Sequence, residues 1–446
     1  MGARWKNVVA AVLVAVAVAG LAGCLRITAD NLYSLPEVSE QYLRLQRRID
    51  SILGLNAEFS PPTGGMNRQA VQLKDLDGDG VDEVIAFFTL PDSSSLSVYI
   101  FSMLGEDFVV EVMIEGIGTR IESVRYVDMD GDGIVEVVLG WEMDTALKYM
   151  SIYSIKGFQS VLLAQAEYSA IKVFDMNGDG FDEVIALRLP TMESGATAKV
   201  FMLMQDGEII SEEARLSSNV NAIQRVSVGR LVDNVPAIFV DCEGKFENGS
   251  FVTDILVYQD ESFSNISCKD PSGISEETLR SRMQSQDINK DGIIEVPIPR
   301  RLKSLSETAY YAIDWYAFDS FGMSRLALTT YHNNYDEWYL IMPSSWRGKV
   351  SVRREDAVSG ERTVIFSYIA GNDGPYDDFL KIYKLYGDRR EERAKLPGRT
   401  ILMSEGATIY AFELLPTPEN SGIQVDQALI KENFKLIYSD WLSGVV

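Results

Sequence analysis

Residues 75–87, DLDGDGVDEVIAF, are the most informative segment of the chain because similar segments recur along it. Further copies begin at residue 128 (DMDGDGIVEVVLG), residue 175 (DMNGDGFDEVIAL) and residue 287 (DINKDGIIEVPIP). A fifth copy, VGRLVDNVPAIFV at 228–240, keeps the hydrophobic frame but has lost the acids. With that copy counted, the units are about 50 residues long, a period typical of repeat architectures. The sequence therefore predicts five similar units in a row.

The four intact copies carry oxygen-bearing side chains at positions 1, 3, 5 and 9, and glycine at position 6. Side chains at alternate positions of a tight turn converge on one point, and the glycine lets the backbone curl around it. Calcium takes about six to eight oxygen ligands, and the backbone carbonyl of position 7 can supply one. The predicted ligands of about four Ca²⁺ sites are Asp75, Asp77, Asp79, Val81 and Glu83; Asp128, Asp130, Asp132, Ile134 and Glu136; Asp175, Asn177, Asp179, Phe181 and Glu183; and Asp287, Asn289, Asp291, Ile293 and Glu295.

The alternative to a metal site is an ordinary acidic turn, since Asp and Gly are common in turns. Four copies at a regular period favour metal, because so many neighbouring carboxylates would otherwise repel one another. Magnesium is disfavoured because the turns offer many ligands and look flexible. Asn177 and Asn289 replace a carboxylate with a neutral oxygen, so we expect those two sites to bind more weakly.

The segments around each acidic turn are typical of strands and not of helices. Residues 84–88 and 136–139 are short runs rich in β-forming residues. Residues 96–101 and 108–113 predict two further strands around a turn at Gly105. Four strands per unit, repeated radially, describe the blade of a β-propeller. The acidic turn would then join the first strand of each blade to the second.

An Asp-rich turn between two strands, once per blade, resembles the FG-GAP and VCBS repeat families. The resemblance covers about residues 60 to 332, and it implies a calcium-loop propeller of a surface or secreted protein. We therefore predict a mainly β fold, a five-bladed propeller over residues 58–334. Glu at position 9 departs from the families, which more often have Asp there. In the acid-free fourth copy, we hypothesise that Arg230 supplies the positive charge that calcium supplies elsewhere.

The chain has three cysteines, of which Cys242 and Cys268 belong to the fourth unit. Their positions predict the second and fourth strands of one blade. That separation is roughly 9–10 Å, because neighbouring strands lie about 4.8 Å apart. A disulfide cannot bridge such a gap. We predict that both thiols are free.

The N-terminus resembles a bacterial lipoprotein leader. Residues 1–23 combine Arg4 and Lys6 with an apolar run, and Leu-Ala-Gly precedes Cys24, as in a lipobox. The resemblance implies that Cys24 is acylated, with palmitate among its lipids, and anchors the chain to the extracytoplasmic side of the bacterial cell membrane. The alternative is an uncleaved membrane anchor, which leaves the remainder on the same side. Residues 24–57 are predicted to form a tether and a helix that runs from Pro36 to Gly54.

Residues 335–446 lack the repeat and predict a small α+β domain. Strands are expected at 338–346, 349–353 and 362–369, and a hairpin at 399–415. Helices are expected at 377–393 and in the last segment, which includes Trp441. Trp338, Trp346 and Trp441 either line a ligand groove or, as is more usual for tryptophan, belong to the core.

Charge and residue content favour a binding protein over an enzyme. Lys and Arg total 41 and Asp and Glu total 65, so the net charge of −24 repels nucleic acid. No nucleophile elbow or phosphate-binding loop is present. The single histidine, His332, is expected to be an exposed residue in a linker. We predict a calcium-binding scaffold for a protein or glycan ligand at the cell surface; a polysaccharide-lyase-like enzyme and a purely structural envelope protein remain alternatives.

Overall fold

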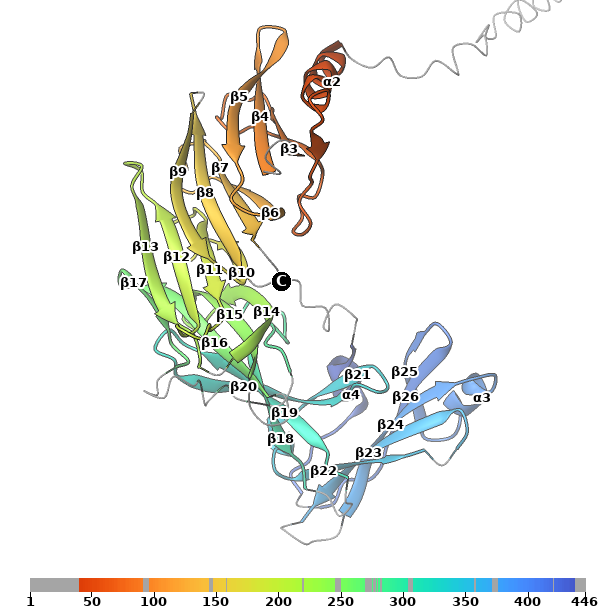
Figure 1. The fold of residues 1–446 in the computed structure, drawn as a ribbon. Helices are drawn as coiled ribbons and strands as arrows, with labels where there is room; N and C mark the ends of the chain where they lie inside the picture. Colours follow the sequence, from red (N-terminus) through yellow and green to blue (C-terminus); the bar gives the residue numbers. More distant parts are fainter. Residues whose placement is uncertain are drawn as a thin grey trace, which may run out of the picture.

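The computed structural model describes residues 40–437, apart from gaps at 91–95, 144–146, 158, 219, 245–249, 269–274, 276–277, 279, 281–282, 304–307, 357, 371–375 and 420. The predicted leader and Cys24 lie outside the described residues. The chain is mainly β, with a series of antiparallel sheets and few helices, as predicted (Figure 1). No helix in the described part is long and apolar enough to span a membrane.

The first two sheets follow an N-terminal helix, α2, which spans Glu40–Leu53 within the predicted helical range. The first sheet contains β1 (Glu58–Phe59), β2 (Val71–Lys74), β3 (Glu83–Thr89), β4 (Leu96–Leu104) and β5 (Asp107–Glu115). The second contains β6 (Arg120–Val127), β7 (Glu136–Glu142), β8 (Lys148–Lys156) and β9 (Gln159–Glu167). The strands pair in chain order, from β2 to β5 in the first sheet and from β6 to β9 in the second.

The third and fourth sheets repeat this four-stranded order. The third contains β10 (Ala170–Phe174), β11 (Glu183–Arg188), β12 (Thr197–Leu203) and β13 (Ile209–Arg215). The fourth contains β14 (Val220–Arg230), β15 (Pro236–Gly244), β16 (Phe251–Gln259) and β17 (Ser262–Asn265).

The fifth sheet includes strands from outside the repeat unit. It contains β18 (Val296–Arg301), β19 (Tyr311–Phe318), β20 (Ser324–Asn333), β21 (Trp338–Met342) and β27 (Phe434–Leu436). The first strand of this repeat unit, which corresponds to β2 in the first sheet, is reduced to a single bridge between Gln286 and Glu295. The repeat ends with β20, next to the boundary predicted at 334. The sheet itself continues across that boundary, because β21 pairs with β20.

The sixth sheet forms the body of the C-terminal segment. It contains β22 (Val350–Glu355), β23 (Glu361–Ile369), β24 (Tyr376–Tyr386), β26 (Thr408–Leu414) and β25 (Arg399–Glu405). The helices beside it are η3 (Ser344–Trp346), α3 (Arg390–Ala394) and α4 (Gln427–Asn433). The helix predicted at 377–393 is wrong, because Leu380 and Ile382 lie in β24 between β23 and β26. The hairpin predicted at 399–415 is confirmed.

The sheets pack face to face in chain order, along an open arc (Figure 1). The outer face of the first sheet is covered by α2, whose Ile49 and Ile52 pack against Phe88 and Phe101. A closed ring needs that face for contact with the fifth sheet. The repeat array is therefore a curved row of five sheets, and the closed propeller predicted from the sequence is not confirmed.

Two further expectations concern single residues. His332 was expected in a linker, but it lies in β20, stacked on Tyr339 and close to Trp315. Its burial lowers the pKa of the imidazole to about 3. Trp338 and Trp346 are core residues, and Trp441 lies outside the described residues. Cys242 and Cys268 are not joined in a disulfide, as predicted.

Candidate metal centre

Each acidic turn of the first three sheets joins the first strand to the second, as predicted. In the first sheet the turn leaves β2 at Lys74 and enters β3 at Glu83, which are paired across the ladder. The same pairing joins Val127 to Glu136 and Phe174 to Glu183. The glutamate at position 9 is therefore fixed at the start of the second strand, with its side chain directed back into the turn.

The first turn gathers its carboxylates by accepting hydrogen bonds from its own backbone. Asp75 accepts from the N–H groups of Gly78 and Gly80, at 2.8 and 3.0 Å. Asp79 accepts from the N–H of Val81 at 2.7 Å, which fixes the residue expected to offer a carbonyl ligand. Glycine is required at positions 4 and 6 because Gly78 and Gly80 have φ of 75° and 86°.

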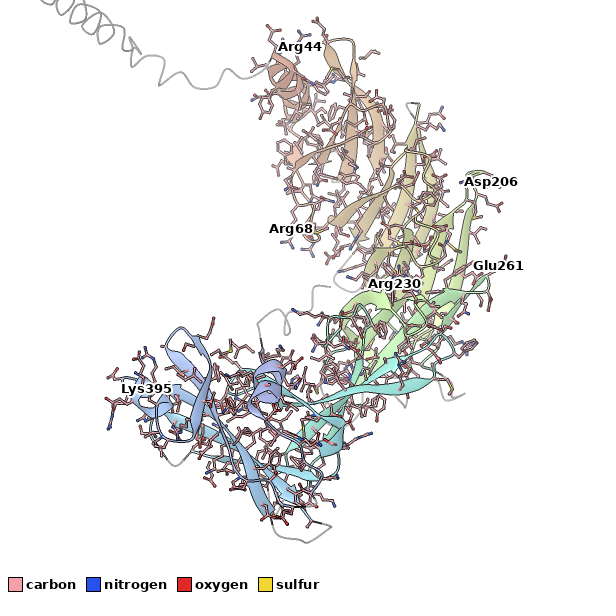
Figure 2. All side chains as sticks on the ribbon, turned by 180° about the vertical axis from the view of Figure 1, so that it is seen from behind. Arg44, Arg68, Asp206, Arg230, Glu261 and Lys395 are labelled. Carbon is pink, nitrogen blue, oxygen red and sulfur yellow. The ribbon has the colours of Figure 1, made fainter. Side chains whose placement is uncertain are left out.

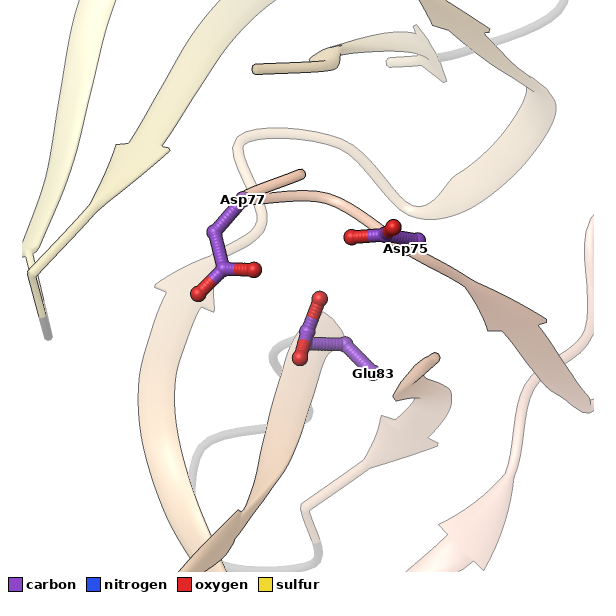
Figure 3. A group of neighbouring side chains, drawn as sticks. All are labelled: Asp75, Asp77 and Glu83. Atoms are coloured by element: carbon purple, nitrogen blue, oxygen red, sulfur yellow. The ribbon is translucent and has the colours of Figure 1, made fainter. Parts of the chain in front are cut away.

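These bonds bring ligand atoms from three side chains together. One carboxylate oxygen from each of Asp75, Asp77 and Glu83 lies within 4.8 Å of the other two, and Figure 3 shows the three side chains facing a common centre. Asp128, Asp130 and Asp132 form the same kind of group in the second turn. Three anionic oxygens at this spacing offer a partial shell for a hard cation, which a carbonyl and water can complete.

The glutamates at position 9 are the buried members of the four sites. Glu83, Glu136, Glu183 and Glu295 are each less than 5% exposed. Burial is the main cause that raises the pKa of the first three to about 7 and that of Glu295 to about 8. Neighbouring aspartates raise these pKa values further, whereas a backbone N–H from position 2 opposes the shift. A bound cation would remove the penalty for ionising these groups.

The third and fourth sites differ from the first two because asparagine occupies position 3. The amide nitrogen of Asn177 donates to Asp179 at 2.9 Å and to Glu183 at 3.0 Å. Asn289 makes the equivalent bonds to Asp291 and Glu295, at 2.9 and 3.4 Å. In these two turns an amide N–H group takes the place between carboxylates that a cation would occupy. A metal would have to turn the amide over to reach its oxygen.

The fourth sheet has a short turn without this acidic frame. Arg230 donates to the carbonyl of Asn234 at 3.0 Å, within its own turn. The backbone of Arg230 also bridges to Ile293 in the acidic turn of the fifth sheet. Neither contact tests the hypothesis that Arg230 substitutes for calcium. The guanidinium does hold a backbone carbonyl of the one repeat turn that lacks the Asp-x-Asp/Asn-x-Asp-Gly motif.

Neighbouring turns stack directly on one another along the arc. A Cβ atom on Gly78 would lie 2.6 Å from the carbonyl oxygen of Gly133 in the next turn. A Cβ atom on Gly131 would overlap the ring of Phe181 in the third turn. The N–H of Val135 donates to the carbonyl of Leu76 at 2.8 Å. Ordering one turn therefore orders the packing surface of the next.

Comparisons with known proteins give a local family match and a distant likeness of shape. A family model described as an FG-GAP-like repeat matches residues 57–139, which hold the first sheet and most of β6 and β7. No curated protein matches the chain. Among solved structures, the rhamnogalacturonan lyase YesW is similar with a TM-score of 0.31 and 11% identity, over 78% of this chain and 62% of the lyase. The exotype rhamnogalacturonan lyase YesX gives 0.26 and 10%, over 80% of this chain and 76% of that one.

Proposed function

We propose that this protein is a calcium-dependent binding scaffold, held on the extracytoplasmic face of a bacterial membrane by lipid on Cys24. The observation that carries the calcium part is the group of three carboxylates in each of the first two turns, which neighbouring sheets stack together. The FG-GAP-like match, which covers both of these turns, supports the same interpretation.

Calcium would act on the whole row through the stacked turns. Each ion fixes one turn and removes the mutual repulsion of its carboxylates. Because the turns touch, binding at one site favours the ordered form of its neighbour. Stabilisation then grows with the free calcium concentration by mass action. The row becomes a stiff surface for a ligand where calcium is abundant.

The calcium part is tested by metal analysis and thermal unfolding of the full chain in calcium and in EGTA. We expect bound calcium and a higher melting temperature with calcium. Asp128→Asn should lower the calcium content and the calcium-dependent gain. Glu208→Gln, which removes an exposed carboxylate outside the turns, should change neither. Identical melting of the wild type in both media contradicts the proposal.

The anchor is tested separately by labelling the protein with palmitate in a bacterial host. The wild type should carry the label and sediment with membranes. Cys24→Ser should lose the label, and its unprocessed leader should then be retained. Retention of the label in Cys24→Ser would reject the lipid anchor and leave the calcium proposal untouched.

A further inference from the structure

The inner strands of the curved row carry a line of basic side chains. Arg125 in β6 and Lys172 in β10 occupy the same register position, opposite Val138 and Ile185. Arg225 follows in β14. Figure 1 places these three strands on the concave side of the arc, and β5, β9, β13 and β17 on the convex side. In a chain with a net charge of −24, this concentration of cations on one side is unexpected.

Arg68 adds a fourth cation to the same side. Figure 2 shows Arg68 on the concave side, whereas Asp206 and Glu261 lie on the convex side. The guanidinium of Arg68 donates to the carbonyl of Gly65 at 2.8 Å.

None of these four cations forms an ion pair with a described carboxylate. Arg125 donates to the hydroxyl of Ser123 at 2.9 Å and to the carbonyl of Ile171 at 3.4 Å. Arg225 donates to Gln284 at 3.4 Å. Glu122 is the carboxylate that acts on Arg125, but its own ion pair is with Lys148 at 3.4 Å. The positive charges of this line are therefore only partly balanced.

Lys172 lies in the middle of the line, between the charges of its neighbours. Burial lowers the pKa of its amine, and the nearby guanidinium groups of Arg125 and Arg225 lower it further. The three side chains repel one another in the protein alone. An anion placed among them would relieve that repulsion.

A pocket of about 590 Å³ opens where these side chains meet. Arg68, Arg125 and Lys172 line it together with Tyr126, Ile171 and Val173. The lining therefore combines positive groups with an aromatic ring and apolar side chains. That combination suits a sugar that bears an acidic group, since sugars present apolar ring faces as well as polar edges.

We propose that the pocket lined by Arg68, Arg125 and Lys172, together with Arg225 next to Lys172 on the same concave side, binds an acidic saccharide chain. The occupant is a chain because the cations extend over three successive sheets, and stacked sheets lie on the order of 10 Å apart. Acidic groups on alternate sugars have a comparable repeat. The inference gives the proposed binding scaffold a ligand class, and it rests on that binding role but not on calcium.

The test uses hyaluronan oligosaccharides, which carry a carboxylate on alternate sugars, and isothermal titration calorimetry at low salt. We expect the wild type to bind them and the same oligosaccharides with reduced carboxyl groups to bind far more weakly. The variant Arg68→Gln/Lys172→Gln should lose about tenfold in affinity, or roughly 1.4 kcal/mol. Glutamine is a suitable replacement because Gln72 occupies this register position in the first sheet. Arg125 is left intact because it joins β6 to Ile171.

Lys156→Gln is the matched control, because Lys156 is exposed at the end of β8 and does not line the pocket. It should leave the affinity unchanged. Equal binding of the charged and reduced oligosaccharides, or an unchanged affinity in the double variant, overturns the proposal. Free glucuronate that binds as tightly as the chain also overturns it. Poly(glycerol phosphate) is titrated in the same way. If the double variant weakens its binding and Lys156→Gln does not, the site recognises anionic groups in general, and phosphate is a second ligand group besides carboxylate.

The titration is repeated in EGTA to separate this inference from the proposed function. Binding that persists without calcium supports the groove even if the acidic turns bind no metal. Calcium-dependent melting without any oligosaccharide binding leaves the metal proposal standing and rejects the groove.

Discussion

The second and fourth sheets share one four-stranded plan but place their acidic residues differently. In the second sheet, Asp128, Asp130 and Asp132 gather in a partly exposed turn, and none of the three forms an ion pair with a basic side chain of the described residues. In the fourth sheet, Asp241 and Asp254 lie inside β15 and β16 and are fully buried. The same anionic groups are thus directed to solvent in one sheet and to the protein interior in the other.

The buried acids of the fourth sheet are balanced by donors from the chain itself. Asp241 pairs with Arg280 at 2.7 Å and accepts two bonds from Ser285. Asp254 accepts from Ser217 and Ser275, which lie on segments before and after the sheet. Because these donors are covalently part of the protein, this network does not depend on the medium. The acidic turns need a partner from solution, so their stability should follow the calcium concentration.

The largest effect is expected from a variant that breaks the hydrogen-bonded network around Asp241 in the fourth sheet. Arg280→Met leaves Asp241 buried without its cation, and this should lower the free energy of unfolding by about 3–5 kcal/mol. The loss should be the same in calcium and in EGTA. Urea unfolding in both media measures it. A loss that disappears in one of the two media would contradict the distinction between the sheets.

A somewhat smaller effect is expected where two acidic turns touch. Gly131→Ala forces a side chain at φ of 74° and against the ring of Phe181, and should cost about 1–3 kcal/mol. Gly133→Ala is the matched control, with φ of 87° but open space around the new atom. The difference between the two variants measures the packing of one turn on the next. Equal losses would show that stacking contributes nothing.

Exchanging Asp and Asn at position 3 tests how this residue sets the calcium affinity of an acidic turn. Asn177→Asp removes the amide that donates to Asp179 and Glu183, so it should lower the stability in EGTA. It should raise the calcium affinity of the third turn by about tenfold, or roughly 1.4 kcal/mol. Asp130→Asn should do the opposite in the second turn. Calcium titrations of both variants check the exchange, and shifts of the same sign would contradict it.

The smallest effect is expected at His332, whose imidazole pKa is lowered by burial. Burial lowers the imidazole pKa from 6.5 to about 3 in the folded protein. The folded state therefore favours the neutral ring, and its contribution is present above pH 6.5 and lost as the pH falls toward 3. The NMR signal of this single histidine should not shift between pH 5 and 8. In urea it should titrate near 6.5, and a similar titration in the folded protein would contradict the burial.

The repeating unit could be predicted from local sequence patterns alone. The acidic turns, their four-stranded units and the joining of first to second strand all follow from local patterns of glycine, aspartate and β-forming residues. The FG-GAP-like match covers residues 57–139, which hold the first two copies of the acidic turn. Turn chemistry is local, so a short stretch such as 75–83 contains nearly all the information that shapes it.

The assembly of the units, and the contacts between side chains from different sheets, could not be predicted from local sequence patterns. Whether five sheets close into a ring depends on what covers the face of the first one, and here Ile49 and Ile52 of α2 do so. The pairing of Asp241 with Arg280 joins residues 39 apart in the sequence, and no local pattern predicts it. The line from Arg125 through Lys172 to Arg225 likewise exists only because separate sheets stack. Long-range packing brings these charges together, and packing depends on every sheet at once.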